Sequence, residues 1–177
     1  MAHVIEPASS ARAKCRGCGE RIAKDTLRLG ERLANPYGEG EMTHWFHLTC
    51  GAYKRPEPFL EALRATTEEI EDVARLEHAA QHALVHRRLP RIDGAQRASS
   101  ARANCRHCHE LIERGAWRIR LVYYEEGRFK PSGYVHLRCT PAYFGTTDVV
   151  DHVRQFSPAL TESDLAEIRA GLVLPGA

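Results

Sequence analysis

Two stretches of the chain place apolar residues at the three- and four-residue spacing that is typical of an α-helix. These positions are Ile70, Val73 and Leu76 in the first stretch and Leu165, Ile168 and Leu172 in the second. Polar and acidic residues separate them, so each stretch has one apolar side to pack and one side for water. We therefore expect an amphipathic helix at both places.

Helix-start signals precede both stretches. Thr66 and Glu69 have the spacing of a capping box, in which the two side chains each accept a hydrogen bond from the other residue's backbone N–H. Thr161 can cap the second stretch in the same way, with Asp164 in the place of the glutamate. This pattern predicts that the two helices begin just after Thr66 and Thr161.

Other segments carry strand and turn signals. Residues 116–124 alternate between apolar and polar side chains and are rich in aromatic and β-branched types, which indicates a β-strand. Residues 36–40 and 130–133 contain proline and glycine and are typical of loop tips. Pro90 would end a preceding helix and Asp93-Gly94 favours a turn, so residues 89–94 form a predicted junction.

The chain also repeats itself. Residues 8–18 (ASSARAKCRGC) recur as residues 98–108 (ASSARANCRHC), with nine of eleven positions identical. An internal repeat indicates two copies of one structural unit. We therefore predict an α+β fold of two small domains, each with a short antiparallel sheet and a trailing amphipathic helix. The predicted boundaries are 1–89 for the first domain, 90–97 for a linker and 98–177 for the second domain.

Each copy contains a Cys-x2-Cys pair followed, after a long gap, by a His-x2-Cys pair. The gap is 28 residues between Cys18 and His47 and 27 residues between Cys108 and His136. Together the two pairs supply three thiolates and one imidazole, which is a common ligand set of a structural zinc ion, and they use all six cysteines. The predicted ligands are Cys15, Cys18, His47 and Cys50 in the first copy and Cys105, Cys108, His136 and Cys139 in the second.

The repeat also tests which histidines are ligands. Only His47 and His136 recur in register, because glycines stand opposite the other candidates, His44, His107 and His109. A disulfide interpretation would leave both recurring histidines unexplained and would need an oxidising compartment. Four protein ligands leave no open position for a catalytic water, so we expect two structural Zn²⁺ ions and no zinc catalysis.

Charge is distributed unevenly along the chain. The net charge is only +2, but residues 1–55 carry +3 and residues 95–147 carry +5, whereas residues 56–94 and 148–177 carry −3 each. The cysteine-bearing blocks are therefore basic and the helical blocks are acidic. Basic blocks of this kind favour a polyanionic ligand.

The motifs together resemble a known family. The sequence Ser-Ser-Ala-Arg-Ala-x-Cys-x2-Cys, the strand residues 27–29 (LRL) and the element His44-Trp45-Phe46-His47-x2-Cys50 are similar to the zinc finger of poly(ADP-ribose) polymerases, which also occurs in a eukaryotic DNA ligase. The resemblance covers both cysteine blocks and implies a sensor of DNA strand breaks that binds nicks, gaps and ends with little regard to sequence.

The resemblance also implies roles for particular residues. Four arginines would grip phosphates, namely Arg12, Arg28, Arg102 and Arg118. Apolar side chains in the loop before the second ligand pair would stack on bases exposed at a break, namely Tyr37 and Met42 in the first copy and Phe129 and Pro131 in the second. Trp45 and Trp117 are expected in the core. The second copy departs from the family pattern, with Tyr134-Val135-His136 in place of Trp45-Phe46-His47.

We therefore expect a protein without catalytic activity whose partner is double-stranded DNA with breaks, together with a separate DNA repair enzyme. The alternative is a zinc-stabilised adaptor that binds protein through its acidic helices. The sequence contains no apolar run near the roughly 20 residues of a membrane span and no secretory signal at residues 1–12. Arginine outnumbers lysine 21 to 4. This bias is typical of GC-rich coding sequence and favours a bacterial cytoplasm and nucleoid over a nucleus.

Overall fold

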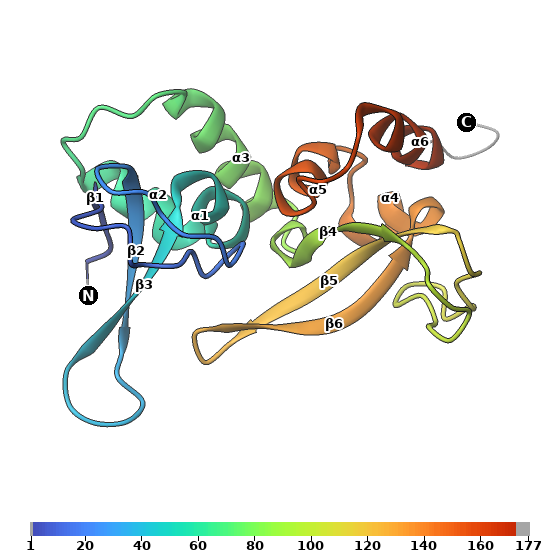
Figure 1. The fold of residues 1–177 in the computed structure, drawn as a ribbon, viewed down its shortest axis with the longest axis horizontal. Coiled ribbons are helices and arrows are strands. Elements are labelled where there is room, and N and C mark those ends of the chain that lie inside the picture. The colour runs from blue at the N-terminus through green and yellow to red at the C-terminus, as the bar shows by residue number, and fades with distance from the viewer. Residues whose placement is uncertain (1, 173–177) are drawn as a thin grey trace. The chain divides into compact units, whose positions relative to one another are not determined.

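The computed structural model describes residues 2–172, which divide into two compact units. The first unit ends at Val85 and also includes Glu126–Phe129, and the second begins at His86. In each unit three strands precede three α-helices (Figure 1). The internal repeat of the sequence is therefore a repeat of the fold, and the predicted α+β class with two small antiparallel sheets is confirmed.

The first unit is built on strands β1 (Val4–Pro7), β2 (Leu27–Ala34) and β3 (Glu41–His47), which pair antiparallel in that order. Helices α1 (Leu48–Lys54), α2 (Pro56–Ala65) and α3 (Val73–Val85) follow. Leu29, Phe46 and Phe59 are fully buried and bring β2, β3 and α2 into one core. The long β2–β3 loop contains the segment 36–40, as its proline and glycines predict.

One ion pair fixes the helices of the first unit to its sheet. Glu31 on β2 is 1% exposed, and its carboxylate accepts hydrogen bonds from the Arg55 side chain, including one of 3.0 Å from Nε to Oε2. Arg55 is the residue between α1 and α2, so the pair joins both helices to β2. A buried carboxylate needs such a partner, because burial of an unpaired charge is costly.

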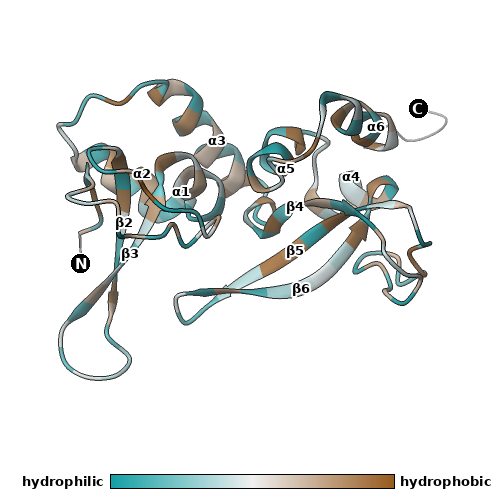
Figure 2. Ribbon diagram, in the orientation of Figure 1, coloured by the Kyte–Doolittle hydropathy of each residue, from teal (hydrophilic) through white to brown (hydrophobic). Residues whose placement is uncertain are grey.

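The second unit begins with a 3₁₀ turn, η1 (Leu89–Arg91), and contains strands β4 (Ile92–Arg97), β5 (Trp117–Glu125) and β6 (Arg128–His136). The turn η2 (Leu137–Cys139) and helices α4 (Thr140–Phe144), α5 (Val150–Phe156) and α6 (Glu162–Leu172) follow. Ile119, Val135 and Ile168 are fully buried in its core. Apolar and polar segments alternate along β5 (Figure 2), as the strand prediction for residues 116–124 requires.

Residues 92–97, expected within a linker, instead form β4, the first strand of the second sheet. Ser157, at the end of α5, fixes this strand, because its hydroxyl accepts from Ala95 N at 3.0 Å and donates to Ala95 O at 3.2 Å. Gly94, at φ +94°, packs against the same serine, because a Cβ on Gly94 would lie only 2.0 Å from Ser157 Oγ. The Asp93-Gly94 pair therefore marks a bulge that fits the strand to α5.

The predicted loop tip at residues 130–133 lies within β6. The turn of this hairpin is Glu126-Gly127, where both residues have positive φ, at 50° and 74°. Pro131 is compatible with β6 because β6 is an edge strand, where proline is tolerated.

The two predicted helix starts have different outcomes. In the second unit Asp164 N donates to Thr161 Oγ1 at 3.1 Å and Thr161 N donates to Asp164 Oδ2 at 2.8 Å, so the capping box is formed. In the first unit the prediction is wrong, because α3 begins only at Val73. Thr66 Oγ1 instead accepts from Glu68 N at 3.1 Å, and Asp72 adopts φ +55° before the helix. No helix among residues 2–172 is both long and apolar enough to span a membrane.

Candidate metal centres and the residues around them

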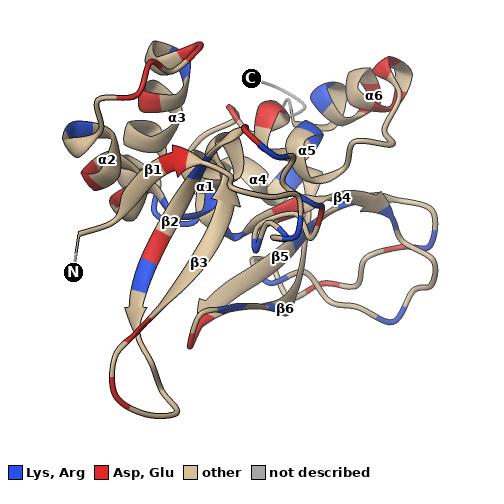
Figure 3. Cartoon of the chain, turned by 60° about the vertical axis from the view of Figure 1, so that its left-hand side comes forward, with Lys and Arg blue, Asp and Glu red and all other residues tan. Residues whose placement is uncertain are grey.

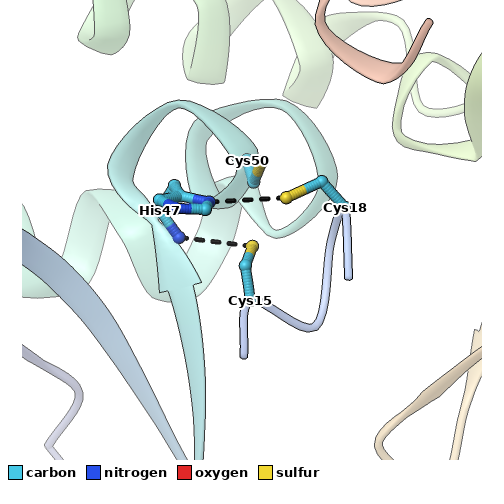
Figure 4. A group of neighbouring side chains, drawn as sticks. All are labelled: Cys15, Cys18, His47 and Cys50. Atoms are coloured by element: carbon cyan, nitrogen blue, oxygen red, sulfur yellow. Dashed lines mark hydrogen bonds between the residues drawn. The ribbon is translucent and has the colours of Figure 1, made fainter. Parts of the chain in front are cut away.

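The first predicted ligand set is assembled as expected. Cys15 and Cys18 lie in the β1–β2 connection, His47 ends β3 and Cys50 lies in α1. Their ligand atoms all lie within 4.8 Å of one another, and the four side chains converge on one point (Figure 4). Three sulfurs and one nitrogen at this spacing fit a tetrahedral zinc ion and leave no position for a substrate.

A backbone carbonyl sets which nitrogen of His47 faces the sulfurs. Nε2 lies 3.3 Å from the carbonyl oxygen of Arg21, and Nδ1 lies 3.4 Å from Cys18 Sγ. If Nε2 carries the proton and donates it to that carbonyl, Nδ1 keeps its lone pair for the metal. This outer hydrogen bond is the usual way in which a protein orients a zinc-binding histidine.

Backbone N–H groups stabilise the Cys15 sulfur as a thiolate. Gly17 N and His47 N both donate to Cys15 Sγ, each at 3.3 Å. Hydrogen bonds with Cys18 and Cys50 lower the pKa of the Cys15 thiol far below its ordinary value. Gly17 is needed in this turn because a Cβ there would lie only 2.9 Å from Cys50 Cβ. The turn therefore favours the form of the sulfur that binds metal.

The second ligand set repeats this geometry. Cys105, Cys108, His136 and Cys139 also place their ligand atoms within 4.8 Å of one another. His136 Nδ1 lies 3.4 Å from Cys108 Sγ, and its Nε2 lies 3.1 Å from the carbonyl oxygen of Leu111. Burial tends to raise the pKa of the Cys105 thiol, but backbone hydrogen bonds from Cys108, His136 and His107 give a net lowering.

The other histidines are not part of either centre. Within residues 2–172, the groups able to hold a metal contain neither His44 nor His107 nor His109. His109 instead adopts φ +62° at the end of the Cys-x2-Cys turn, where Gly19 of the first unit has φ +81°. The comparison of the two copies therefore selected the correct histidines.

Two of the four predicted phosphate-gripping arginines lie under aromatic rings. Arg28 is 7% exposed and its guanidinium carbon lies 3.5 Å from the centre of the Trp45 ring. Arg118 is 5% exposed and lies 3.6 Å from the centre of the Tyr134 ring. Trp45 and Trp117, both expected in the core, are each partly exposed. The sheet register pairs Arg28 with the zinc ligand His47.

The other two arginines are exposed. Arg12 and Arg102 each lie three residues before the first cysteine of their copy. Lys14 and Arg16, which flank Cys15, are also exposed, and the sequence interpretation missed them. A cavity of about 510 Å³ opens beside the first zinc centre. It is lined by Ala13, Lys14, Cys15, Arg16, Gly19, Thr43 and Trp45. The alternating basic residues around the Cys-x2-Cys turn were the available signal for this surface.

The predicted stacking residues have different surroundings. Tyr37 is 83% exposed in the β2–β3 loop, where its backbone N–H donates to Asn35 Oδ1 at 3.0 Å. Met42 is partly exposed on β3. Phe129 and Pro131 lie on β6 rather than in a loop. Tyr37 is therefore the more accessible of the two aromatic side chains among the four.

These features define a tandem zinc-binding module: two Cys3His centres, each joining the Cys-x2-Cys turn of its unit to the end of the sheet and the element that follows. Residues 6–87 match the family model described as "Poly(ADP-ribose) polymerase and DNA-Ligase Zn-finger region". This part of the chain is therefore similar to the zinc fingers of that family, the second unit repeats its ligand set, and the residues of both centres fit structural zinc ions.

Curated relatives match both halves of the chain. A poly(ADP-ribose) polymerase of Drosophila melanogaster is 27% identical over 158 residues, which cover 78% of this chain and 16% of the relative. Poly(ADP-ribose) polymerase 1 of Gallus gallus is 33% identical over 130 residues, covering 64% and 13%. The polynucleotide 3′-phosphatase ZDP of Arabidopsis thaliana is 27% identical over 201 residues, covering 96% and 28%. The chain thus spans less than a third of each relative.

Proposed function

We propose that this chain binds DNA at strand breaks, without sequence specificity and without a reaction of its own. The observation that carries the proposal is the repetition of one arrangement: in each unit a closed zinc centre holds a turn with exposed basic residues beside a ring-stacked arginine. A closed centre has no site for a catalytic water, so its role is to hold the fold. The relatives are polymerases of ADP-ribose and a phosphatase named for polynucleotide 3′ ends.

The exposed basic residues provide the sequence-independent part of binding. Arg12, Lys14 and Arg16 surround the first cysteine of the first unit, and Arg102 and Arg106 do so in the second. Phosphate contacts of this kind fix a protein on DNA without reading the bases. Arg28 and Arg118, which are 7% and 5% exposed, are the further phosphate contacts that we propose in each unit.

Recognition of a break depends on base stacking. A break exposes the face of a terminal base pair, which an intact duplex does not offer. A side chain that stacks there gains about 1–3 kcal/mol, judged from single-strand stacking platforms. Tyr37 is exposed and suited to this contact, and Met42 follows on the next strand. Phe129 and Pro131 have the corresponding role in the second unit, on β6.

The test is a titration of the zinc-loaded chain with two DNA hairpins at one fixed moderate salt concentration. One hairpin carries a single-nucleotide gap and the other is sealed. We expect at least tenfold tighter binding to the gapped hairpin, which corresponds to about 1.4 kcal/mol. Tyr37→Ala removes this preference, whereas Arg12→Glu weakens binding to both hairpins. Equal affinity for both hairpins would contradict break recognition.

One observation favours a second candidate, the protein-binding adaptor. A groove of about 530 Å³ lies between α2 and α3. Its lining includes the apolar residues Leu60, Leu63, Ile70 and Val73 and the acidic residues Glu68, Glu69 and Glu77. An apolar groove with an acidic rim suits a basic, partly apolar segment of another protein. Absence of binding to either hairpin would favour this function, and charge reversal at Arg28 and Arg118 would then leave partner binding intact.

A further inference from the structure

The two ring-stacked arginines differ in charge at one cross-strand neighbour, on the strand opposite the stacked ring. The first sheet pairs Glu6 on β1 with Arg28 on β2, and the second pairs Gln96 on β4 with Arg118 on β5. The same position of the repeat thus holds a carboxylate in one unit and a neutral amide in the other. Figure 3 shows the acidic segment on β1 in red.

In the first unit the carboxylate neutralises the arginine. Glu6 Oε1 accepts a hydrogen bond from Arg28 Nη2 at 3.0 Å, while the Glu6 side chain remains 44% exposed. The Trp45 ring covers one face of the same guanidinium. An incoming phosphate must therefore compete with a carboxylate that already holds Arg28, and two anions at one guanidinium repel each other.

In the second unit the arginine charge has no such partner. Among residues 2–172, no carboxylate lies within ion-pair distance of Arg118, and its buried Nε, like that of Arg28, has no hydrogen-bond acceptor. The Tyr134 ring gives the only cation–π contact found for this guanidinium in that part of the chain. A charge that is 95% removed from water and unpaired is costly. A phosphate oxygen in contact with this guanidinium would supply the missing counter-charge.

We propose that Glu6 is an internal competitor for phosphate at Arg28, so that the second unit provides the stronger phosphate grip of the pair. This inference rests on the proposed DNA binding. It makes the difference between Glu6 and Gln96 a determinant of how strongly each unit holds the DNA backbone. The opposite hypothesis is that Glu6 orients Arg28 toward the phosphate, and it predicts effects of the opposite sign.

The test exchanges the two side chains in the full chain. Glu6→Gln frees Arg28, and we expect about fivefold to tenfold tighter binding of the gapped hairpin. Its salt dependence becomes steeper by about 0.9 in the slope of log K against log salt, which is one additional phosphate contact. Gln96→Glu neutralises Arg118, and we expect weaker binding by a similar factor and a slope that is flatter by about 0.9.

Two control variants separate these effects from a general change of net charge. Glu57→Gln removes an acidic group from the exposed side of α2, and Ala166→Glu adds one to the exposed side of α6. Both are expected to change affinity less than twofold. Circular dichroism and a zinc content of two per chain establish that each variant is folded. Both exchanged residues are similar in shape to the originals, so the fold should be retained.

The outcomes distinguish failure of the competitor role of Glu6 from failure of the proposed DNA binding. If the unaltered chain prefers the gapped hairpin but Glu6→Gln leaves affinity unchanged or weakens it, the competitor role is overturned and break binding stands. The same conclusion follows if Gln96→Glu leaves affinity and slope unchanged. If the unaltered chain binds neither hairpin, the proposed function fails, and the inference fails with it.

Discussion

At the scale of single residues, the turn at each zinc centre requires a left-handed backbone after its second cysteine. The first unit uses Gly19 there, at φ +81°, and the second uses His109, at φ +62°. This conformation destabilises a residue with a Cβ by roughly 1–2 kcal/mol. Histidine is one of the side chains that occur there more often than most. At this turn the second unit therefore carries a local strain that the first unit does not.

Replacement of His109 by glycine should stabilise the second unit. The relief of strain exceeds the extra entropy that glycine loses on folding, so we expect a gain of about 0.5–1 kcal/mol. For a domain of this size the unfolding midpoint rises by a few degrees. Thermal unfolding of the zinc-loaded variant measures the shift.

His107→Gly is the matched control for this prediction. His107 is exposed, lies in the same turn and has negative φ, so glycine there only adds flexibility to the unfolded chain. It should lower the midpoint slightly. A midpoint for His109→Gly at or below that of the unaltered chain would contradict the strain argument.

At the scale of elements, the two copies begin their last helices differently. Thr161 caps α6 through a reciprocal pair of hydrogen bonds with Asp164, whereas Thr66 lies seven residues before α3 and bonds only to Glu68 N. Thr161→Ala should therefore cost about 1 kcal/mol, as loss of a helix cap usually does. Thr66→Ala should lower the free energy of unfolding by only a few tenths of that amount. Urea unfolding curves of both variants provide the comparison, and equal losses would refute the assignment of the caps.

The Glu31–Arg55 pair is a buried polar contact between sheet and helices in the first unit. Glu31→Ala leaves the guanidinium of Arg55 without its carboxylate, and the Arg55 side chain is only 22% exposed. Loss of one partner of a buried pair costs about 3–5 kcal/mol, and partial solvation of Arg55 reduces this to about 2–3 kcal/mol. Glu57→Ala on the exposed side of α2 should change stability by less than about 0.5 kcal/mol. Denaturant titration of both variants measures the two changes in the free energy of unfolding.

The sequence was sufficient for features that depend on residue type and spacing. Both zinc centres, the strand at 116–124 and the α6 cap were predicted because ligands, alternation and capping pairs are local signals. The start of α3 could not be predicted, because Thr66-x2-Glu69 has a valid capping pattern that the chain does not use. Strand β4 was missed because the pair Asp93-Gly94 is a turn signal when the sequence is considered alone. In the structure this pair forms a bulge in the strand, next to the contact between Ala95 and Ser157.

The burial of the arginines could not be predicted from the sequence, for a similar reason. Arg28 and Trp45 lie 17 positions apart, and only the β2–β3 register brings the guanidinium under the ring. The pairing of Arg28 with Glu6 likewise depends on the register of β1 against β2. Motif resemblance selected Arg28 and Arg118 as functional residues, but it gave no sign that one is neutralised and the other is not.

At the scale of the whole molecule, two small units each contain one cluster of four residues that could hold a metal ion. Each has a thin apolar core, and its zinc centre ties the Cys-x2-Cys turn to the end of the sheet and to the element that follows. In domains of this kind the free energy of metal binding is part of the free energy of folding. Removal of zinc by a chelator should therefore unfold both units, and circular dichroism should show the loss of helix signal.

Single ligand variants give the sharpest form of this prediction. Cys18→Ser and Cys108→Ser each remove one sulfur from one centre, so native mass spectrometry should find one zinc ion per chain in place of two. Each variant should keep the unfolding transition of the intact unit, since no ligand is shared between the centres. Loss of both ions from either variant would contradict independent folding of the two units.

The same pair of variants tests why two fingers are joined in one chain. Linking two weak sites raises the effective concentration of the second once the first is bound, so overall affinity can exceed either alone by about 10²–10⁴. If both units contact one DNA molecule, each variant should bind the gapped hairpin at least a hundredfold more weakly than the intact chain. Cys108→Ser should lose more affinity than Cys18→Ser, because it removes the unit whose Arg118 has no competing carboxylate. A loss of only twofold in both variants would mean that the units bind separate DNA molecules.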